Sequence, residues 1–277
     1  MPIPYPLASR GGYGHLFFPF CSLVRTFITP AIVLHRTRYS DRYSIYHLYT
    51  LGRGRVGVLV PERTNKRNPL RELFRPLSEL EVTLEDNPKK ELLRVQEARI
   101  IDPHHAVYLD AVKAAQAMFL SEFLYRVCLS PEVDSDLYRF LSYALTLWDQ
   151  SQRSVANFHL CFLLRLLDVL GIAPYLPLPP LEPLPFCLLD HVYTEAPRGV
   201  SLTAEQAQHL SLFSRMTFAN MHCFRYHRGQ RQLILDRLLD YYRLHLHDFP
   251  PLKCLPILRQ LGEEELRGQI LAPDGME

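Results

Sequence analysis

The apolar positions between residues 28 and 101 mostly follow the two-residue period of β-strands. Five segments carry this pattern: residues 28–34, 44–50, 55–60, 80–84 and 92–101. Gly52-Arg53-Gly54 separates the second segment from the third and indicates a tight hairpin. Five short strands, an early hairpin and little helix predict a small closed barrel.

After residue 104 the apolar positions repeat with the period of an α-helix. The first helical face contains Ala106, Val107, Leu109, Val112, Ala115, Met118, Phe119, Phe123 and Val127. Asp134 is the candidate N-cap of a second helix. Residues 154–170 are apolar on nearly every side from Leu160 onward, which predicts a central buried helix. A capping box at residues 203–206 and apolar faces in 231–246 and 252–261 predict three more helices.

Residues 173–185 contain six prolines, which favours an extended strap over the surface rather than a helix. A PxxP-type ligand is the alternative. These patterns predict an α+β multidomain chain with four parts. We expect an extension at residues 1–26, a barrel domain at 27–102, a helical domain at 103–265 that includes the strap, and a tail at 266–277. The extension is expected to be disordered or to reflect a misassigned start.

Two features bear on location. No apolar run reaches the roughly 18 residues that a membrane span needs, and the first 24 residues match a secretory signal poorly. The six cysteines form no CxxC pair, which favours reduced thiols in a cytoplasmic protein. We therefore expect no membrane association.

Positive charge is concentrated in the predicted barrel, although the formal net charge of the whole chain is only +2. Residues 35–75 hold ten Lys or Arg and three Asp or Glu. Such a local field attracts phosphate backbones and makes binding depend on salt. Tyrosines are interleaved with these charges, and aromatic rings can stack on the bases of single strands.

The predicted nucleic-acid contacts are Arg36, Arg38, Arg53, Arg55, Arg63, Lys66, Arg67, Arg71, Tyr46 and Tyr49. Tyr39, Tyr43 and Phe74 belong to the same aromatic set. The segment from Arg63 to Asn68 is expected to be a flexible cationic loop that can follow a backbone without recognising bases. The alternative is that the tyrosines fill the barrel core and the charges only solvate its surface.

Metal and catalytic motifs are weak or absent. Cys187 with His191, and His222 with Cys223 and His227, could together supply zinc ligands, but the spacing is looser than is usual for such sites. The chain has no GxSxG, GxxxxGK[ST] or HExxH motif. We therefore expect neither an enzyme nor a zinc protein, and a metal-dependent hydrolase is kept as a minor alternative.

Short motifs occur along the chain in a specific order. They are Ile32-Val-Leu-His35, Tyr39-Ser-Asp41, Leu48-Tyr-Thr50, Gly52-Arg-Gly-Arg-Val-Gly57, Arg75-Pro-Leu77, Phe119-Leu-Ser-Glu-Phe-Leu-Tyr125, the segments 158–171 and 231–242, and Leu252-Lys-Cys-Leu255. Their order and spacing resemble those of the bacterial RecO family over about residues 28–262. Two departures stand out. The paired cysteines of zinc-containing RecO proteins are replaced by the proline strap and Cys187, and the closing "LKS" motif has Cys254 in place of serine.

The resemblance implies an N-terminal OB-fold, an all-helical C-terminal domain and a non-enzymatic protein that binds and anneals single-stranded DNA. The partners it implies are RecR, the single-stranded DNA-binding protein and, indirectly, RecA in the RecF pathway, in a cytoplasmic, nucleoid-associated setting. The acidic and apolar tail of the single-strand binder needs an apolar groove rimmed by cations, for which Arg126, Arg153 and Arg165 are candidates. An OB-fold protein that binds RNA or an acidic protein is the alternative.

Overall fold

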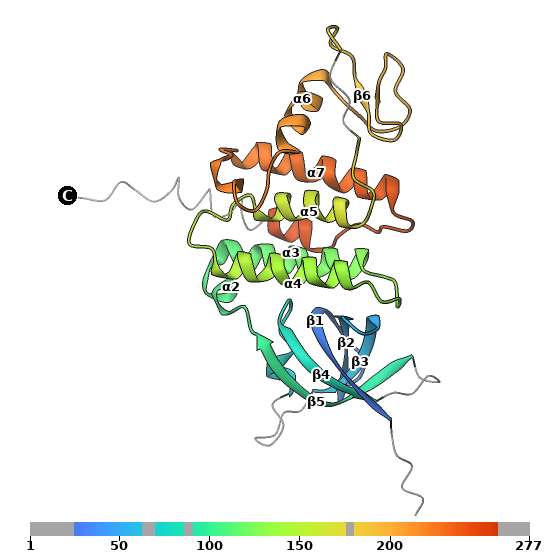
Figure 1. Cartoon of the computed structure of the whole chain (residues 1–277), viewed down its shortest axis with the longest axis vertical. Coiled ribbons are helices and arrows are strands. Elements are labelled where there is room, and N and C mark those ends of the chain that lie inside the picture. Colours follow the sequence, from blue (N-terminus) through green and yellow to red (C-terminus); the bar gives the residue numbers. More distant parts are fainter. Residues whose placement is uncertain (1–24, 63–69, 86–90, 176–179, 260–277) are drawn as a thin grey trace, which may run out of the picture.

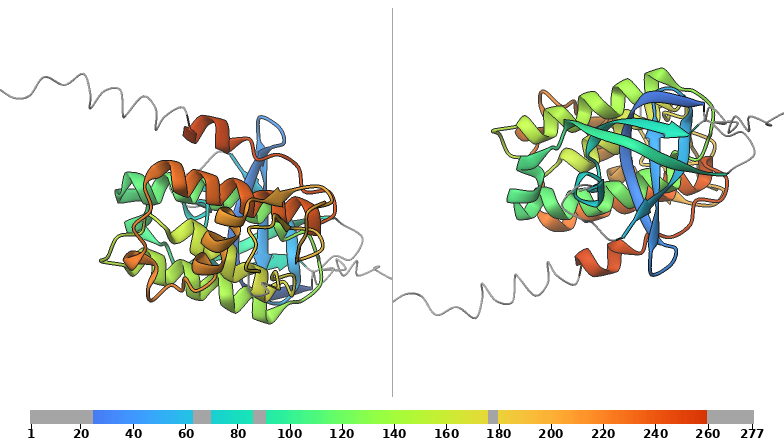
Figure 2. Two further views of the ribbon diagram at one scale, coloured as in Figure 1. Left: turned by 90° about the horizontal axis from the view of Figure 1, so that it is seen from above. Right: turned by 90° about the horizontal axis from the view of Figure 1, so that it is seen from below.

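The computed structural model describes residues 25–62, 70–85, 91–175 and 180–259. Within them, the barrel and the helical domain are stacked along the long axis of the molecule (Figure 1). The helices α3 and α4 lie next to the barrel, α5 and α7 lie beyond them, and α6 and β6 are farthest away. Views from above and below show the helical layers covering one side of the barrel (Figure 2).

The barrel consists of five strands that close in the order β1-β2-β3-β5-β4. Their bounds are β1 (Thr26–Arg38), β2 (Tyr43–Thr50), β3 (Gly54–Pro61), β4 (Glu79–Glu85) and β5 (Leu92–Asp102), with the short helix α1 (Leu70–Leu73) between β3 and β4. Only the β3–β5 pairing is parallel. This confirms the predicted barrel, which is OB-like.

Successive side chains of a strand point to opposite faces, so the buried barrel residues belong to two different cores. Val33 of β1 points into the barrel, where it packs with residues such as Leu48 and Val58. Ile32 and Leu34, on the opposite face of β1, belong to the core of the helical domain. The register of β1 against β2 shifts between Val33 and His35. This bulge turns the end of β1 so that Arg36 pairs with a barrel-facing position of β2.

The helical domain begins with α2 (His105–Leu109), α3 (Ala111–Val127), α4 (Ser135–Gln150) and α5 (Phe158–Val169). A small sheet follows, made of β6 (Phe186–Cys187), β7 (Val192–Tyr193) and β8 (Ser201–Leu202). The chain continues through α6 (Ala204–Phe213), the 3-10 turn η1 (Met221–Cys223) and α7 (Arg228–His245), and residues 254–259 are helical.

Several helix predictions are confirmed. Asp134 caps α4 by accepting a hydrogen bond of 2.9 Å from the Leu137 amide. Thr203 and Gln206 form the predicted capping box of α6. Most residues of α5 are buried, as expected of a central helix. These features depend mainly on local sequence, which explains why the sequence predicts them.

Two helix-domain predictions are wrong. The first helical pattern is divided at Asp110, whose extended backbone ends α2 and whose side chain accepts from Lys113 N at 2.8 Å to cap α3. The predicted face is therefore only partly buried: Phe119 and Phe123 of α3 are buried, whereas Leu109 of α2 is 88% exposed and Val112 of α3 is 52% exposed. The domain is also not all-helical, because the three-stranded sheet of β6, β7 and β8 lies within it.

The barrel and the helical domain share a continuous interface. The buried carboxylate of Glu79 at the start of β4 accepts hydrogen bonds from Tyr138 Oη at 2.7 Å and Ser142 Oγ at 2.9 Å, both on α4. The Ser121 hydroxyl of α3 donates to the Leu34 carbonyl. These contacts hold α3 and α4 against the outer face of β1 and β4.

Candidate nucleic-acid interface

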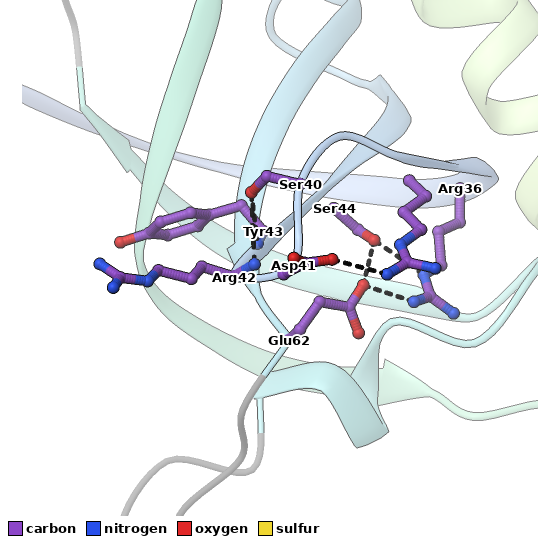
Figure 3. A network of polar contacts seen from close by, with 8 residues as sticks. Arg36, Ser40, Asp41, Arg42, Tyr43, Ser44 and Glu62 are labelled. Atoms are coloured by element: carbon purple, nitrogen blue, oxygen red, sulfur yellow. Dashed lines mark hydrogen bonds and ion pairs between the residues drawn. The ribbon is translucent and has the colours of Figure 1, made fainter.

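The turn between β1 and β2 presents charged and aromatic side chains at one end of the barrel. The amide groups of Tyr39 and Ser40 both donate to the Tyr43 carbonyl, at 3.3 and 2.9 Å. The Ser40 hydroxyl accepts from the Arg42 and Tyr43 amides. The tight turn leaves Tyr39 62% exposed and Tyr43 43% exposed. Figure 3 shows Tyr43 and Arg42 extending away from the turn.

Arg36 is fixed at the same end of the barrel. Its Nε donates to Ser44 Oγ at 3.0 Å, and its Nη2 pairs with the Glu62 carboxylate (Figure 3). The Glu62 hydrogen bond raises the pKa of the Arg36 guanidinium. The Glu62 amide also donates to the Arg42 carbonyl at 2.8 Å, which joins the end of β3 to the turn.

The other two cations of the turn are more accessible. Arg38 pairs with Asp41 at 2.8 Å, but their side chains are 76% and 93% exposed. An ion pair this exposed contributes only about 0–1 kcal/mol to stability. A phosphate can therefore replace Asp41 as the partner of Arg38 at little cost in free energy. Arg42 makes no ion pair within the residues that the structure describes. We call the surface formed by Arg36, Arg38, Tyr39, Arg42 and Tyr43 the basic tip.

Tyr46 and Tyr49, predicted to stack on bases, are core residues. Tyr46 is 4% exposed and packs on Phe74 inside the barrel, with ring centroids 5.1 Å apart. Tyr49 is 2% exposed and belongs to the core shared with the helices. Burial raises the pKa of the Tyr49 hydroxyl. Neither ring can contact a base here, and the exposed rings are those of Tyr39 and Tyr43.

Arg53 and Arg55 do not join the basic tip. They lie at the turn between β2 and β3, which is at the opposite end of β2 from the tip. The Arg53 guanidinium lies 4.0 Å from the centroid of the Phe27 ring. Arg55 donates to the Tyr125 carbonyl at 3.1 Å and lies 4.3 Å from its ring centroid, so it connects the barrel to α3. Arg53 and Arg55 therefore lie apart from Arg36 and Arg38, and their contact with nucleic acid stays a prediction.

Four predicted contacts have no described side chain. Arg63, Lys66 and Arg67 lie outside the described residues. Arg71 lies in α1, and only its backbone is described. Their proposed contacts with nucleic acid stay predictions.

A cluster of rings at the junction of the two domains was missed by the sequence analysis. The Tyr125 ring lies 4.5 Å from His35 and 4.7 Å from His47, measured between centroids. Burial, and then the charge of Arg55, lowers the pKa of His47 to about 4. Sequence patterns could not indicate this cluster, because His35 and His47 lie on strands and Tyr125 lies on a helix far along the chain. Their role is to hold the domains together.

The three arginines predicted to bind a partner serve separate local contacts. Arg126 lies 5.1 Å from the Tyr125 ring centroid. Arg153 donates to His222 Nε2 at 3.1 Å. Arg165 pairs with Asp168 at 2.9 Å and donates to the Ser214 carbonyl at 2.7 Å. These contacts lie on different elements, and the role of the three arginines in partner binding stays a prediction.

An apolar cavity of about 420 Å³ lies elsewhere in the helical domain, between α5, α6 and α7. Its apolar lining includes Leu164, Leu167, Leu188, Leu202, Phe213, Ile234 and Tyr241. Arg237, His209 and Gln230 add polar groups. The Arg237 Nε is buried and has no hydrogen-bond partner in the described part of the chain. None of Arg126, Arg153 and Arg165 lines this cavity.

The side chains considered for zinc have other contacts. Cys187 Sγ lies 3.4 Å from Asp190 Oδ2 and 3.3 Å from the Arg198 carbonyl. His227 caps α7 by accepting from the Gln230 amide. Among the described residues, no group of three or more His, Cys, Asp or Glu is arranged to hold a metal ion. No helix in the same residues is long and apolar enough to cross a membrane.

Comparison with known proteins places the fold in a family. The model of the recombination protein O N-terminal region matches residues 24–104, and that of the C-terminal region matches residues 108–177. A DNA repair protein RecO from Porphyromonas gingivalis is 42% identical over 241 residues, which cover 84% of this chain and 98% of the relative. RecO proteins from Phocaeicola vulgatus and Bacteroides fragilis are each 35% identical with the same coverage. The two matched regions coincide with the barrel and the first part of the helical domain, and the chain therefore belongs to the RecO family of DNA repair proteins.

Proposed function

We propose that this RecO-family chain binds single-stranded DNA at the basic tip and promotes annealing of complementary strands. The observation that carries the proposal is that Arg38, Tyr39, Arg42 and Tyr43 are all exposed on one turn. Guanidinium groups bind phosphates of any sequence, and tyrosine rings stack on any base. Annealing needs no catalytic group, because neutralising two strands lowers their repulsion and base pairing then proceeds.

The charge contribution is tested with Arg38→Gln together with Arg42→Gln. Single-strand binding releases about 0.7 counterions per neutralised phosphate, so losing two contacts should lower the slope of log affinity against log salt by about 1.4. Fluorescence anisotropy with a labelled oligothymidine at several salt concentrations measures both affinity and slope. Arg139→Gln is the matched control, because Arg139 pairs with Asp136 in the same i,i+3 spacing and is 74% exposed. Equal affinity and slope in the double variant and the control would contradict the proposal.

The stacking contribution is tested in the same assay with Tyr39→Ala. Loss of one stacked base costs roughly 1–3 kcal/mol, which is about a 5- to 150-fold weaker affinity at fixed salt. The salt slope should not change, because no charge is removed. Tyr143→Ala is the control, because Tyr143 is 61% exposed on α4. A change in slope without loss of affinity would argue against stacking.

The second part of the proposal concerns a protein partner. An acidic and apolar peptide, such as the tail of a single-stranded DNA-binding protein, fits the cavity between α5, α6 and α7. Its apolar side chains would occupy the leucine-rich lining, and its carboxylate would compete with Asp240 for Arg237. Titrating that peptide against Arg237→Gln and against Arg243→Gln, an exposed arginine of the same helix, tests this docking. Equal affinities would refute it.

RecR and RecA complete the proposed function. In this proposal the chain acts with RecR and helps RecA to load on single strands that are covered by their binding protein. Annealing of complementary oligonucleotides coated with that protein, with and without this chain, directly tests whether the chain promotes annealing of covered strands. A binder of RNA is the alternative, and competition between single-stranded DNA and RNA for the basic tip separates the two.

A further inference from the structure

The second half of β5 pairs with only one neighbouring strand. β5 pairs with β3 at residues 92–94 alone, whereas its pairing with β4 continues to Asp102. Within the described part of the chain, the backbone of residues 95–101 forms hydrogen bonds only with β4. Figure 1 shows this half of β5 running toward α2. In the same described residues, the edge of β5 that faces away from β4 therefore has no partner strand. We call this the free edge, and such an edge can accept another strand.

The strand is held in place but its side chains are largely exposed. Val95 and Ala98 are partly buried and pack against the barrel core, which fixes the position of the strand. The exposed side chains of this half are Gln96, Glu97, Arg99, Ile100 and Ile101. The two isoleucines are 45% and 51% exposed, although β-branched apolar residues usually occupy buried strand positions. The free edge is therefore ordered and accessible at the same time.

The charges beside the free edge are complementary to a second copy of the same strand. Between its two bulges, β5 pairs regularly with β4 over residues 97–100, so Glu97 and Arg99 point to the same face. Their ion pair of 2.9 Å joins side chains that are 57% and 70% exposed, so rearranging it costs little free energy. When two copies run antiparallel about Ala98, Glu97 of each copy lies opposite Arg99 of the other. A parallel pairing in register would instead place like charges opposite each other.

We propose that two copies of the chain pair through the free edge of β5, antiparallel and centred on Ala98. The pairing gives both edges hydrogen-bond partners and forms two ion pairs between the copies. It also extends an alternation of charge, because Arg99 already lies opposite Glu81 of β4 on its other side. A pair of edge strands makes a small interface, so we expect a transient dimer. No residue of the basic tip takes part, so the inference does not rest on the proposed function, and the dimer carries two basic tips.

Charge reversal tests this register in the full chain. Glu97→Arg and Arg99→Glu each place like charges opposite each other at both cross-strand positions. Each variant alone should dimerise at least about fivefold more weakly than the wild type, because opposed like charges destabilise a strand pair. The double variant Glu97→Arg with Arg99→Glu restores opposite charges and should dimerise like the wild type. Sedimentation velocity at concentrations up to about 200 μM measures the dissociation constants, which covers the range of a transient interface.

Mixing the two single variants separates the contact between copies from the ion pair within one chain. Both variants lack the Glu97–Arg99 pair, but a dimer of one with the other places opposite charges at both cross-strand positions. The mixture should therefore dimerise with about the wild-type affinity, although each variant by itself does not. Arg139→Glu is the matched control, because it reverses one exposed charge of an ion pair on α4 and should leave dimerisation unchanged.

Three results would overturn the proposal. The first is a wild-type chain that stays monomeric at every concentration. Slow hydrogen exchange of the residue 95–101 amides on the free edge of that monomer would show that another segment of the same chain occupies the edge. The second is a dimer whose affinity is equal in the wild type and both single variants, which would place the contact on another surface. The third is a mixture that dimerises no more strongly than its components.

Discussion

At the scale of single residues, burial separates side chains that the sequence presents as equivalent. Tyr39, Tyr43, Tyr46 and Tyr49 all lie among arginines, yet only the first two are exposed. Tyr46 faces the barrel interior by strand alternation, and Tyr49 faces outward but is covered by the helices. A position on a strand face therefore predicts exposure only where nothing packs on that face.

His47 should make stability depend on pH. Its pKa in the folded chain is about 4, below the 6.5 of an unperturbed histidine, because burial and Arg55 disfavour its charged form. The folded state thus binds fewer protons than the unfolded state between these values. The neutral His47 ring therefore contributes fully to the free energy of unfolding above pH 6.5, and this contribution is lost as pH falls toward 4.

Urea unfolding at pH 7.0 and pH 4.5 measures this effect. The loss of unfolding free energy on acidification should be smaller in His47→Gln than in the wild type, because the variant has no ring to protonate at this position. His209→Gln is the control, because His209 is an exposed histidine. The same loss in the wild type and in His47→Gln would show that His47 does not contribute to the pH dependence.

At the scale of elements, close backbone approaches decide how the segments meet. The hairpin between β2 and β3 contacts the loop between α3 and α4, where the Arg55 amide donates to the Ser130 carbonyl at 2.9 Å. Gly54 makes this possible. Its φ is +54°, and an added Cβ would lie 2.2 Å from the Glu132 carbonyl oxygen.

Gly54→Ala should therefore destabilise the fold. The left-handed backbone costs about 1 kcal/mol for a residue with a side chain, and the clash with Glu132 adds to this. Gly199→Ala isolates the first cost, because Gly199 has φ +70° and no atom within 4 Å of an added Cβ. Urea unfolding should show a larger loss for Gly54→Ala than for Gly199→Ala. Equal losses would mean that the hairpin adjusts to the loop without cost.

At the scale of the whole molecule, the barrel and helices share one core. Ile32, Leu34, Tyr49 and Leu77 of the barrel domain pack in the same cluster as α3, α4 and α5. The Glu79 carboxylate lies in this interface and is 6% exposed. We therefore expect the two domains to unfold as one cooperative unit.

Tyr138→Phe tests the polar part of the interface. The variant keeps the ring but removes the hydroxyl that donates to Glu79, which leaves a buried carboxylate oxygen with one partner fewer. The expected cost is about 1–3 kcal/mol of unfolding free energy. Tyr143→Phe, exposed on the same helix, should have almost no effect. A neutral Tyr138→Phe would show that the Glu79 carboxylate is satisfied without the hydroxyl.

The sequence by itself determined the features that arise from neighbouring residues. The five strands, the turn at Gly52-Arg53-Gly54, the Asp134 cap and the buried α5 follow from periodicity and local hydrogen bonding. The order of short motifs also predicted the family, which the comparisons confirm. The concentration of positive charge in the barrel segment was evident from composition alone.

Only the tertiary structure decided which of these side chains share a surface. Arg36, Arg38 and Arg42 meet at one end of the barrel, whereas Arg55 is used to join the barrel to α3. The sequence could not show that the helical domain covers Tyr49, or that Asp110 ends α2 and begins α3. The physical reason is that burial and contact depend on packing between segments far apart in the chain, whereas periodicity reports only which face of a segment is apolar.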